Sequence, residues 1–305
     1  MTSSDAYDIR DFVFERILNE DPLLHTVTLL GSQKIAGSAN VPAIVRIEKT
    51  ALPVFTDGFV ERSVLIESTD IYTWLFGWLP HSADNPDVKI NVICPATETH
   101  IRKYSTQRFH IVRETPALYE RIVKPYIDAF PASRTQWVED IISGQSEASK
   151  VLFRSPPNTA NGFLILPDMK WDLVTVNSLY LVAIATTSGV RSLRDLRSEH
   201  VPMLKSVKRE AVRVAGEKWG LKKTELRLFV HYQPSYYHFH VHIVNSNYTG
   251  LQGMSTGQAH MLDDLISLLE LDGTLLQRMT LAYSLGENHA LCAPMLEAQA
   301  ELDEV

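Results

Sequence analysis

The sequence has very little cysteine and no long apolar run. Cys94 and Cys292 are the only cysteines among 305 residues, and two thiols so far apart do not make a disulfide framework. No stretch approaches the roughly 18 consecutive apolar residues of a membrane-spanning helix. Residues 1–11 are polar and acidic and lack the apolar core of a secretory signal. We therefore expect no membrane partner and a reducing compartment, the cytoplasm, with nuclear entry left open because no localisation signal is evident.

Positive charge is also in short supply. The chain has 29 Lys and Arg residues against 36 Asp and Glu residues, which gives a formal net charge of −7. A protein that coats long nucleic acid needs many cationic side chains against the phosphates, so this balance argues against such a partner. A short, capped or oligomeric nucleotide remains open as a ligand. Hydrophobic residues make up 45% of the chain, which is enough for one large domain or two of moderate size.

Residues 1–100 predict a small β-rich domain with one leading helix. Apolar residues recur at helical spacing over residues 9–18, which predicts that helix. After Pro22 the chain changes to short β-branched segments bounded by Gly, Pro, Asn or Asp, which are typical of antiparallel strands. The expected strands are residues 26–30, 43–47, 59–66 and 88–94.

The rest of the chain mixes helices and strands. Residues 99–124 are charged and weakly apolar, which predicts a hinge followed by a helix. Further on, the expected strands are residues 162–166, 179–185, 226–232 and 238–244, and the expected helices are residues 198–219 and 261–271. The predicted fold class is α+β, with two domains.

Residues 238–244 carry the most informative pattern. Histidine and apolar residues alternate there, so His238, His240 and His242 share one face of a strand. Phe239, Val241 and Ile243 share the other face and can pack on a helix. Three buried imidazoles each need a hydrogen-bond partner, which makes them costly as mere packing. Because histidine titrates near neutral pH, the row offers a nucleophile or base beside groups that hold an anion.

A metal site is the alternative interpretation of this row, because imidazole is a common zinc ligand. Side chains at spacing two along one strand extend over about 13 Å, which is awkward for three ligands of one ion. We therefore favour catalysis over a metal, and a metal over a purely structural role. The preceding loop supports catalysis, since His231, Ser235, Tyr236 and Tyr237 add donors for phosphate oxygens.

The pattern His-φ-His-φ-His-φ-φ resembles the signature of the histidine triad hydrolases and nucleotide transferases. The resemblance implies that His240 attacks a phosphorus to form a nucleotidyl-histidine intermediate, which water resolves without a metal or another cofactor. It implies that His238 and His242 orient the nucleophile and stabilise the phosphates or the leaving group. The third position is His, where the transferase branch has Gln, which favours hydrolysis.

The longer segment HYQPSYYHFHVH resembles the scavenger mRNA-decapping enzymes, a histidine triad branch with an additional N-terminal domain. Three further segments match in the same order: CPATETH (94–100), GFLILPDMKW (162–171) and GVRSLRDL (189–196). This resemblance implies a homodimer in which an N-terminal lid domain, residues 1–100, is exchanged between subunits. A hinge at residues 101–108 and a histidine triad catalytic domain at residues 109–305 complete the expected organisation.

The resemblance also assigns a pocket for the positively charged 7-methylguanine base. Trp137 falls at the stacking position and Glu147 at the position that reads the edge of the base. The loop Pro167, Asp168 and Met169 matches the cap-pocket loop, with Met where relatives carry Leu. Composition alone would make Trp137 a core anchor and Glu147 a solvated loop charge.

The phosphate contacts are assigned in the same way. Lys170 would face a phosphate, and Lys103 would reach the phosphates when the N-terminal domain closes. His231, Ser235 and Tyr236 match the remaining phosphate-contacting residues. Gln258 stands where relatives carry Arg, which puts the strength of phosphate binding in question.

The expected function is hydrolysis of the 5'-5' triphosphate linkage of a cap dinucleotide or short capped RNA (m7GpppN) in 3'-to-5' mRNA decay. The products would be m7GMP and a nucleoside diphosphate or diphosphate-ended oligonucleotide. Two alternatives stay open at this point. One is a general histidine triad hydrolase of dinucleoside polyphosphates or nucleotide phosphoramidates. The other is a cap-binding protein without catalysis, against which the complete triad argues.

Overall fold

The computed structural model describes residues 8–34, 40–50, 52, 58, 60–80, 86–157, 159–249 and 252–303. The chain forms two compact units that divide between Gln107 and Arg108. Across the described residues, no helix combines the length and apolarity needed to cross a membrane. Each unit has a hydrophobic core of its own.

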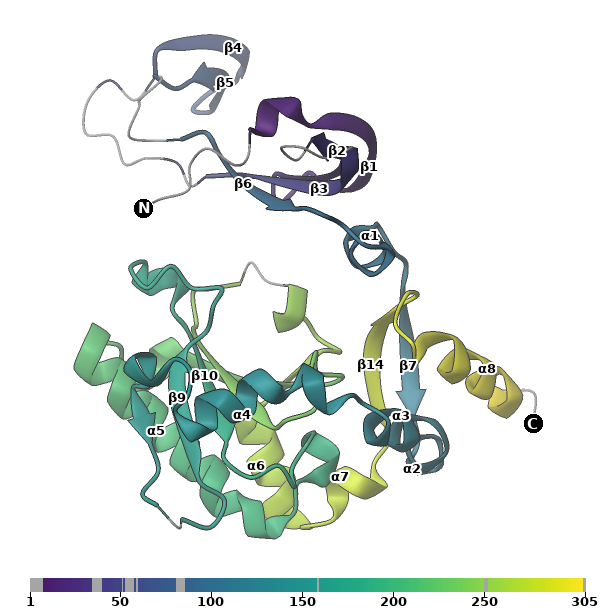
Figure 1. Cartoon of the computed structure of the whole chain (residues 1–305). Helices are drawn as coiled ribbons and strands as arrows, with labels where there is room; N and C mark the ends of the chain where they lie inside the picture. Colours follow the sequence, from purple (N-terminus) through teal and green to yellow (C-terminus); the bar gives the residue numbers. More distant parts are fainter. Residues whose placement is uncertain are drawn as a thin grey trace. The chain divides into compact units, whose positions relative to one another are not determined.

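The N-terminal unit is a four-stranded antiparallel sheet in the order β1-β2-β3-β6, with a separate β4–β5 hairpin (Figure 1). The expected strands at residues 26–30, 43–47 and 88–94 are confirmed. The expected strand at residues 59–66 is confirmed as β4 from Arg62 onward, while Phe59 lies outside the described residues. The elements are β1 Val13–Asp21, β2 Thr26–Lys34, β3 Asn40–Lys49, β4 Arg62–Ser68, β5 Thr73–Trp78, β6 Val88–Ile93 and α1 Glu98–Tyr104.

The helix predicted for residues 9–18 is wrong. A single 3-10 turn at Ile9–Asp11 is followed directly by β1, which pairs with β2. The β1–β2 register shifts between Phe14 and Arg16 and again between Ile17 and Asn19. Such irregularities break the period-two alternation of a strand, and here they leave apolar residues at a spacing that imitates a helix. Strand pairing with β2 therefore overrides the apparent helical pattern.

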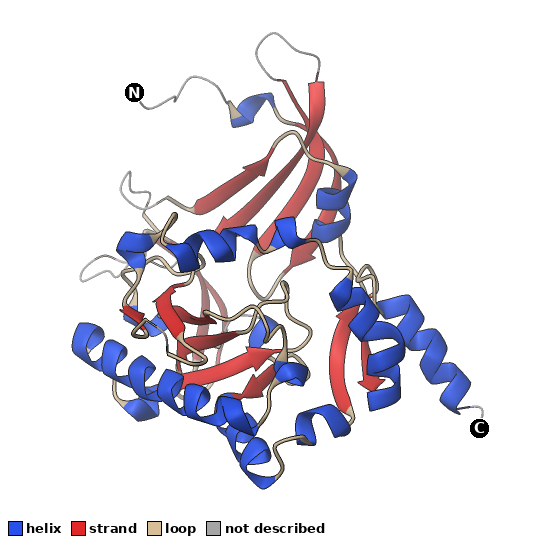
Figure 2. Cartoon of the chain, turned by 60° about the horizontal axis from the view of Figure 1, so that its bottom comes forward, coloured by secondary structure: helices blue, strands red, loops and turns tan. Residues whose placement is uncertain are grey.

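The C-terminal unit is built on a six-stranded antiparallel sheet in the order β13-β11-β12-β10-β9-β8. Its mixture of helices and one main sheet confirms the α+β class, as Figure 2 shows by colour. The expected strands at 162–166, 179–185 and 226–232 and both expected helices are confirmed. The strands and main helices are α4 Gln136–Ser143, β8 Phe153–Arg154, β9 Phe163–Pro167, β10 Tyr180–Ala185, α5 Val201–Trp219, β11 Leu226–His231, β12 His240–Asn245, β13 Ala259–Met261 and α6 Leu262–Leu271.

The two faces of this sheet bury different sets of side chains. On one face, α4 contributes Val138 and Ile141 to a cluster with alternate residues of β9 and β10. On the other face lies the main core, which includes the buried stripe of α5 and the apolar side chains of β12. The stripe ends where Gly220 caps α5 in the left-handed conformation, with φ at 69°.

A two-stranded ribbon of β7 (Phe109–Glu114) and β14 (Leu281–Gly286) completes the unit, and α8 (Cys292–Asp303) packs against it (Figure 1). The helix predicted through residue 124 is therefore wrong over β7, where Val112 and Glu114 are buried in strand alternation. Helical structure begins only afterwards, with α2 Pro116–Leu118, a π-helical turn at Tyr119–Val123 and α3 Lys124–Asp128. The short helix α7 spans Leu275–Arg278.

Candidate active site

The histidine row lies on the face of the sheet that α4 covers. His240 and His242 stand in β12 opposite Ile184 and Val182 of β10, and these two residues pack against α4. Directly paired residues of neighbouring strands point to the same face, so the imidazoles point that way as well. Val241 and Ile243 alternate onto the main core, which confirms the predicted apolar face.

His238 departs from the prediction. The strand was expected to begin at residue 238, but β12 begins at His240, and His238 precedes it in a bend. The Nε2 of His238 donates to the carbonyl oxygen of Ala185 at 2.6 Å. Its Nδ1 lies 3.9 Å from the Glu139 carboxylate of α4. His238 thus contacts the helix that covers the face of His240 and His242, although it lies outside β12.

His240 is held in one orientation by two contacts. Its Nδ1–H donates to the carbonyl oxygen of His238 at 2.8 Å, which leaves Nε2 with a free lone pair. The ring lies parallel to the phenol of Tyr236, with centroids 4.2 Å apart. Burial lowers the pKa of His240 to about 4, so the imidazole is neutral at pH 7. A neutral, oriented imidazole with a free lone pair is the form that acts as a nucleophile.

His242 and His231 form a second close pair of rings. His231 ends β11, and its ring centroid lies 4.1 Å from that of His242. His242 Nδ1 contacts the hydroxyl of Tyr180 at 2.9 Å, while its Nε2 is buried and finds no partner among the described residues. His231 Nε2 donates to the carbonyl oxygen of Gly253 at 2.7 Å. Burial lowers the pKa of His242 well below its usual value and that of His231 to about 4.

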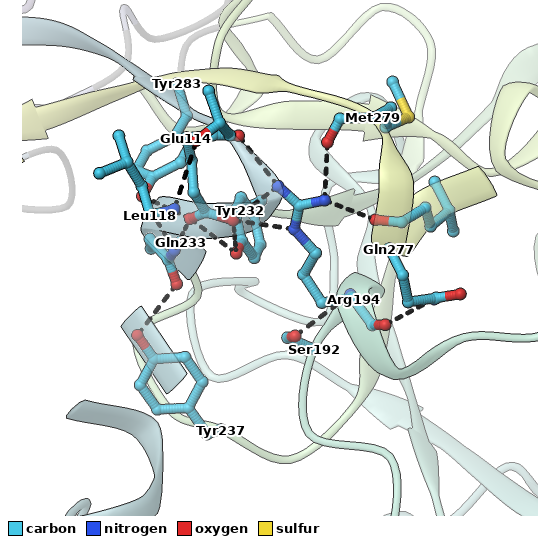
Figure 3. A network of polar contacts seen from close by, with 12 residues as sticks. Glu114, Leu118, Ser192, Arg194, Tyr232, Gln233, Tyr237, Gln277, Met279 and Tyr283 are labelled. Atoms are coloured by element: carbon cyan, nitrogen blue, oxygen red, sulfur yellow. Dashed lines mark hydrogen bonds and ion pairs between the residues drawn. The ribbon is translucent and has the colours of Figure 1, made fainter. Parts of the chain in front are cut away.

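A buried carboxylate, that of Glu114, holds the loop before the histidine row through hydrogen bonds, as Figure 3 shows. Glu114 of β7 accepts hydrogen bonds from the hydroxyls of Tyr232 at 2.8 Å and Tyr283 at 2.7 Å. Gln233 donates to the same carboxylate at 3.2 Å and accepts from the hydroxyl of Tyr237 at 3.0 Å. Two loop tyrosines, Tyr232 and Tyr237, are thus fixed in the interior, whereas Tyr236 stacks on His240.

The same carboxylate pairs with a buried guanidinium. Arg194 Nη2 lies 2.7 Å from Glu114, and both side chains are 0% exposed. Arg194 Nε also donates to Glu114 at 2.8 Å, and Nη1 donates to the carbonyl oxygens of Leu276 at 2.7 Å and Met279 at 2.8 Å (Figure 3). Full hydrogen bonding of both ions is what makes burial of such a pair tolerable.

Trp137, the predicted stacking residue, lies beside the histidine row. It stands in the first turn of α4, and its indole contacts the ring of Tyr236 edge-on, with centroids 4.9 Å apart. Tyr236 in turn stacks on His240, so the three aromatic rings form one continuous series. Trp137 is 43% exposed, which leaves part of the indole open to a ligand. It is therefore not the fully buried core anchor that composition alone would favour.

Glu147 lies in the loop after α4 and is exposed. Its backbone adopts the left-handed conformation, with φ at 51°, and its carboxylate lies 3.3 Å from Lys150. The structure does not bring Glu147 into contact with the rings described above. Its role at the edge of a base stays a prediction.

The predicted loop after β9 lies next to the histidines through Tyr180. Pro167 ends β9, and the backbone N–H of Asp168 donates to the carbonyl oxygen of Tyr180 at 2.9 Å. The Lys170 ammonium lies 5.5 Å from the centre of the Tyr180 ring, and its charge contributes to the lowered pKa of His240. Met169, at the tip of the loop, is 94% exposed.

The structure shows no side-chain contact to the histidines for three other predicted residues, Ser235, Lys103 and Gln258, among the residues that it describes. Ser235 is exposed in the loop before the triad. Lys103 lies in α1 of the N-terminal unit, so its approach to phosphate stays a prediction. The backbone carbonyl of Gln258 accepts from the N–H of Tyr232 at 2.9 Å. Gln258, which stands where relatives carry Arg, therefore lies next to the loop that precedes the histidine row.

Two residues near the histidines were not predicted from the sequence. Glu139 follows Trp137 by two residues and faces His238. Tyr180 begins β10 and is paired with Val244 of β12. Its hydroxyl contacts His242, which lies two residues before Val244. Neither carries a motif, and only the strand register and the packing of α4 bring them to the site.

Comparison with known proteins agrees with these observations. A family model described as scavenger mRNA decapping enzyme (DcpS) N-terminal matches residues 7–107, and one described as scavenger mRNA decapping enzyme C-term binding matches residues 136–257. The m7GpppX diphosphatase of Schizosaccharomyces pombe is 34% identical over 299 residues, which cover 96% of each chain. That of Homo sapiens is 35% identical over 262 residues, covering 84% of this chain and 76% of the relative. That of Ascaris suum is 31% identical over 287 residues, 92% of each chain. The chain belongs to the family of scavenger mRNA-decapping enzymes.

Proposed function

We propose that this protein hydrolyses the 5'-5' triphosphate linkage of m7GpppN, as a free dinucleotide or on a short capped RNA. The products are m7GMP and a nucleoside diphosphate or diphosphate-ended oligonucleotide. The relatives are named m7GpppX diphosphatase, which supports this substrate class. The observation that carries the proposal is the state of His240, whose Nδ1–H is engaged and whose Nε2 is free in a neutral ring.

In the proposed reaction, Nε2 of His240 attacks the phosphorus that carries the 7-methylguanosine. A P–N bond forms, the P–O bond to the neighbouring phosphate breaks, and the nucleoside diphosphate leaves. Water then attacks the same phosphorus, so that a new P–O bond forms and the P–N bond breaks. Splitting one displacement into two in this way is the general advantage of covalent catalysis.

The phosphate charges are met by the groups around His240. His242, His231 and Lys170 lie around His240: burial is the main cause of the lowered pKa of both imidazoles, and the charge of Lys170 lowers each of them further. A bound polyanion acts in the opposite direction, because negative charge favours the protonated imidazole. An imidazole protonated in the complex can then donate its proton to the leaving oxygen.

The base would bind beside the series of rings that ends at Trp137. The 7-methylguanine ring is cationic, and a cation over an indole face gains about 0.5–2 kcal/mol. Met169 supplies an exposed apolar side chain for the opposite face, and Glu147 a carboxylate for the edge. These three roles follow from the family resemblance and from the exposure of each side chain.

We also propose a homodimer that exchanges its N-terminal units. Both strands of the β4–β5 hairpin are exposed along their whole length, including Trp74, Phe76 and Trp78. The β7 strand also exposes Phe109 and Ile111. Exposed large apolar residues gathered on one element, as on the β4–β5 hairpin, are typical of a protein interface.

The test uses the capped dinucleotide m7GpppG in the presence of EDTA, with m7GMP as the measured product. Turnover by the wild-type protein is expected, and its absence would contradict the proposal. The His240→Asn variant should bind the dinucleotide but release no m7GMP. Trp137→Ala should weaken binding by about 2- to 30-fold, the equivalent of the lost cation–π energy.

Two further measurements separate this activity from that of a general histidine triad hydrolase. Unmethylated GpppG should be cleaved much more slowly than m7GpppG, and equal rates would favour the general hydrolase. An alkaline quench during turnover should leave m7GMP attached to His240, detectable by mass spectrometry. Failure to find any adduct at saturating substrate would argue against the covalent route.

A further inference from the structure

Three imidazoles meet in the site, and they are not the three of the predicted row. One ring nitrogen from each of His231, His240 and His242 lies within 4.8 Å of those of the other two. His238 is not in this group. We propose that these three histidines form a binding site for Zn2+, and that the bound ion inhibits the enzyme by occupying the nucleophile. The binding site stands on its own, while the inhibition rests on the proposed function.

The hydrogen bonds leave a free lone pair on each of the three rings. His231 donates through Nε2 to a backbone carbonyl oxygen, and His240 does so through Nδ1. The remaining nitrogens, Nδ1 of His231 and Nε2 of His240, are therefore unprotonated. His242 contacts the Tyr180 hydroxyl through Nδ1, and that hydroxyl can accept its proton. Its Nε2 is buried, and no residue in the described part of the chain hydrogen-bonds to it.

This arrangement is the one that metal-binding histidines require. Neutral imidazole is the ligating form, and its other ring N–H normally donates to a carbonyl oxygen or a similar acceptor. The backbone carbonyls of Gly253 and His238 already supply two such acceptors. A cluster of neutral nitrogens selects Zn2+ over Mg2+ or Ca2+, which prefer oxygen ligands.

The spacing of side chains along one strand does not limit this cluster, because its three histidines come from two strands. Three histidines on one strand extend over about 13 Å, but His231 enters from the neighbouring strand, β11. Zinc–nitrogen bonds of about 2.0–2.1 Å place two tetrahedral ligands about 3.4 Å apart, so the widest pair must close by about 1.4 Å. His231 is only partly buried, so it is the ring that would shift to close the cluster. The fourth zinc position is left for water or a phosphate oxygen.

One nearby charge opposes the ion. Lys170 contributes to the lowered pKa of all three histidines, so its positive charge reaches the cluster. Glu139 faces His238 and not this cluster. Removing the lysine charge should therefore tighten zinc binding, whereas the same change should weaken the binding of an anionic substrate.

The binding test titrates Zn2+ and, separately, Co2+ into the full-length protein. We expect one ion per chain, and Co2+ d–d absorption bands without a thiolate-to-cobalt charge-transfer band, since Cys94 and Cys292 are not ligands. His242→Gln and His231→Gln should each weaken zinc binding by about 10- to 100-fold or more. His238→Gln is the matched control and should bind zinc as the wild type does. Lys170→Met should bind it severalfold more tightly.

The inhibition test adds Zn2+ to the m7GpppG assay. Zinc should raise the apparent KM for the dinucleotide with kcat unchanged, EDTA should reverse the effect, and Mg2+ should have none. Zinc binding that survives His242→Gln, or that fails to occur, would overturn the site. If the protein binds zinc as described but never cleaves m7GpppG, the proposed function fails while the metal site stands.

Discussion

The imidazole of His240 and the phenol of Tyr236 lie almost parallel, with an angle of 11° between the ring planes and 4.2 Å between the ring centroids. Tyr236 thus has two separable parts, a ring that fixes the nucleophile and a hydroxyl that is predicted to contact phosphate. Figure 3 shows that the neighbouring Tyr237 is tied into the interior, so the loop itself stays in place when Tyr236 changes.

Substitution of Tyr236 should separate these two parts. Tyr236→Phe keeps the stack and should raise KM for m7GpppG severalfold while kcat changes little. Tyr236→Ala also removes the stack, and kcat should fall by about 10- to 100-fold because the nucleophile loses its orientation. Steady-state kinetics of the two variants check this. Equal kcat values for Phe and Ala would mean that the ring does not position His240.

The buried imidazoles should make stability depend on pH between about 6.5 and 4. The pKa of His240 is about 4 in the folded protein against 6.5 for an unperturbed side chain. At pH 5 the unfolded chain binds this proton and the folded chain does not, so protonation favours unfolding. Stability from this residue is complete above pH 6.5, and about 2 kcal/mol of it is lost by pH 5.

Chemical denaturation of wild type and His240→Asn at pH 8 and pH 5 tests this dependence. The free energy of unfolding of the variant should fall by about 2 kcal/mol less between the two pH values, because the variant lacks this titrating group. Identical pH dependence in both proteins would show that His240 is not held neutral by burial.

Parts of the fold followed directly from periodicity in the sequence. Two local patterns predicted the buried faces correctly. They are the apolar stripe of α5, which ends at Gly220, and the alternation of apolar residues in β12. The prediction of a helix over residues 9–18 was wrong because two register irregularities disturb the alternation of β1. The β5 strand was missed, although its partner β4, which is equally exposed, was predicted.

The active site was predictable only in part, for a related reason. The three histidines of the row share a local pattern, but the ring that approaches His242 belongs to His231 on another strand. That contact depends on the β11–β12 pairing and on the loop between them, which no local pattern specifies. The approach of Glu139 to His238 likewise requires the packing of α4 on the sheet.

The Glu114–Arg194 ion pair should be among the most sensitive contacts for stability. Glu114→Gln leaves the Arg194 charge buried with incomplete compensation, and loss of one partner of a buried pair costs about 3–5 kcal/mol. Glu120→Gln, which breaks the exposed contact of Glu120 with Lys124, should cost about 0–1 kcal/mol. Urea denaturation of both variants gives the comparison. A similar small loss in both would mean that the buried pair is not a main support of the loop.

Gly253 is the position where a single methyl group should disturb the phosphate side of the site. A Cβ there would lie 2.9 Å from Nε2 and 3.1 Å from Cε1 of His231, so the ring must move and its hydrogen bond to the Gly253 carbonyl must weaken. We expect Gly253→Ala to lower kcat/KM for m7GpppG about tenfold, or about 1.4 kcal/mol of transition-state stabilisation. Gly216→Ala is the control, because its Cβ meets only ordinary contact at 3.5 Å. Wild-type kcat/KM in Gly253→Ala would mean that the position of His231 does not matter for the reaction.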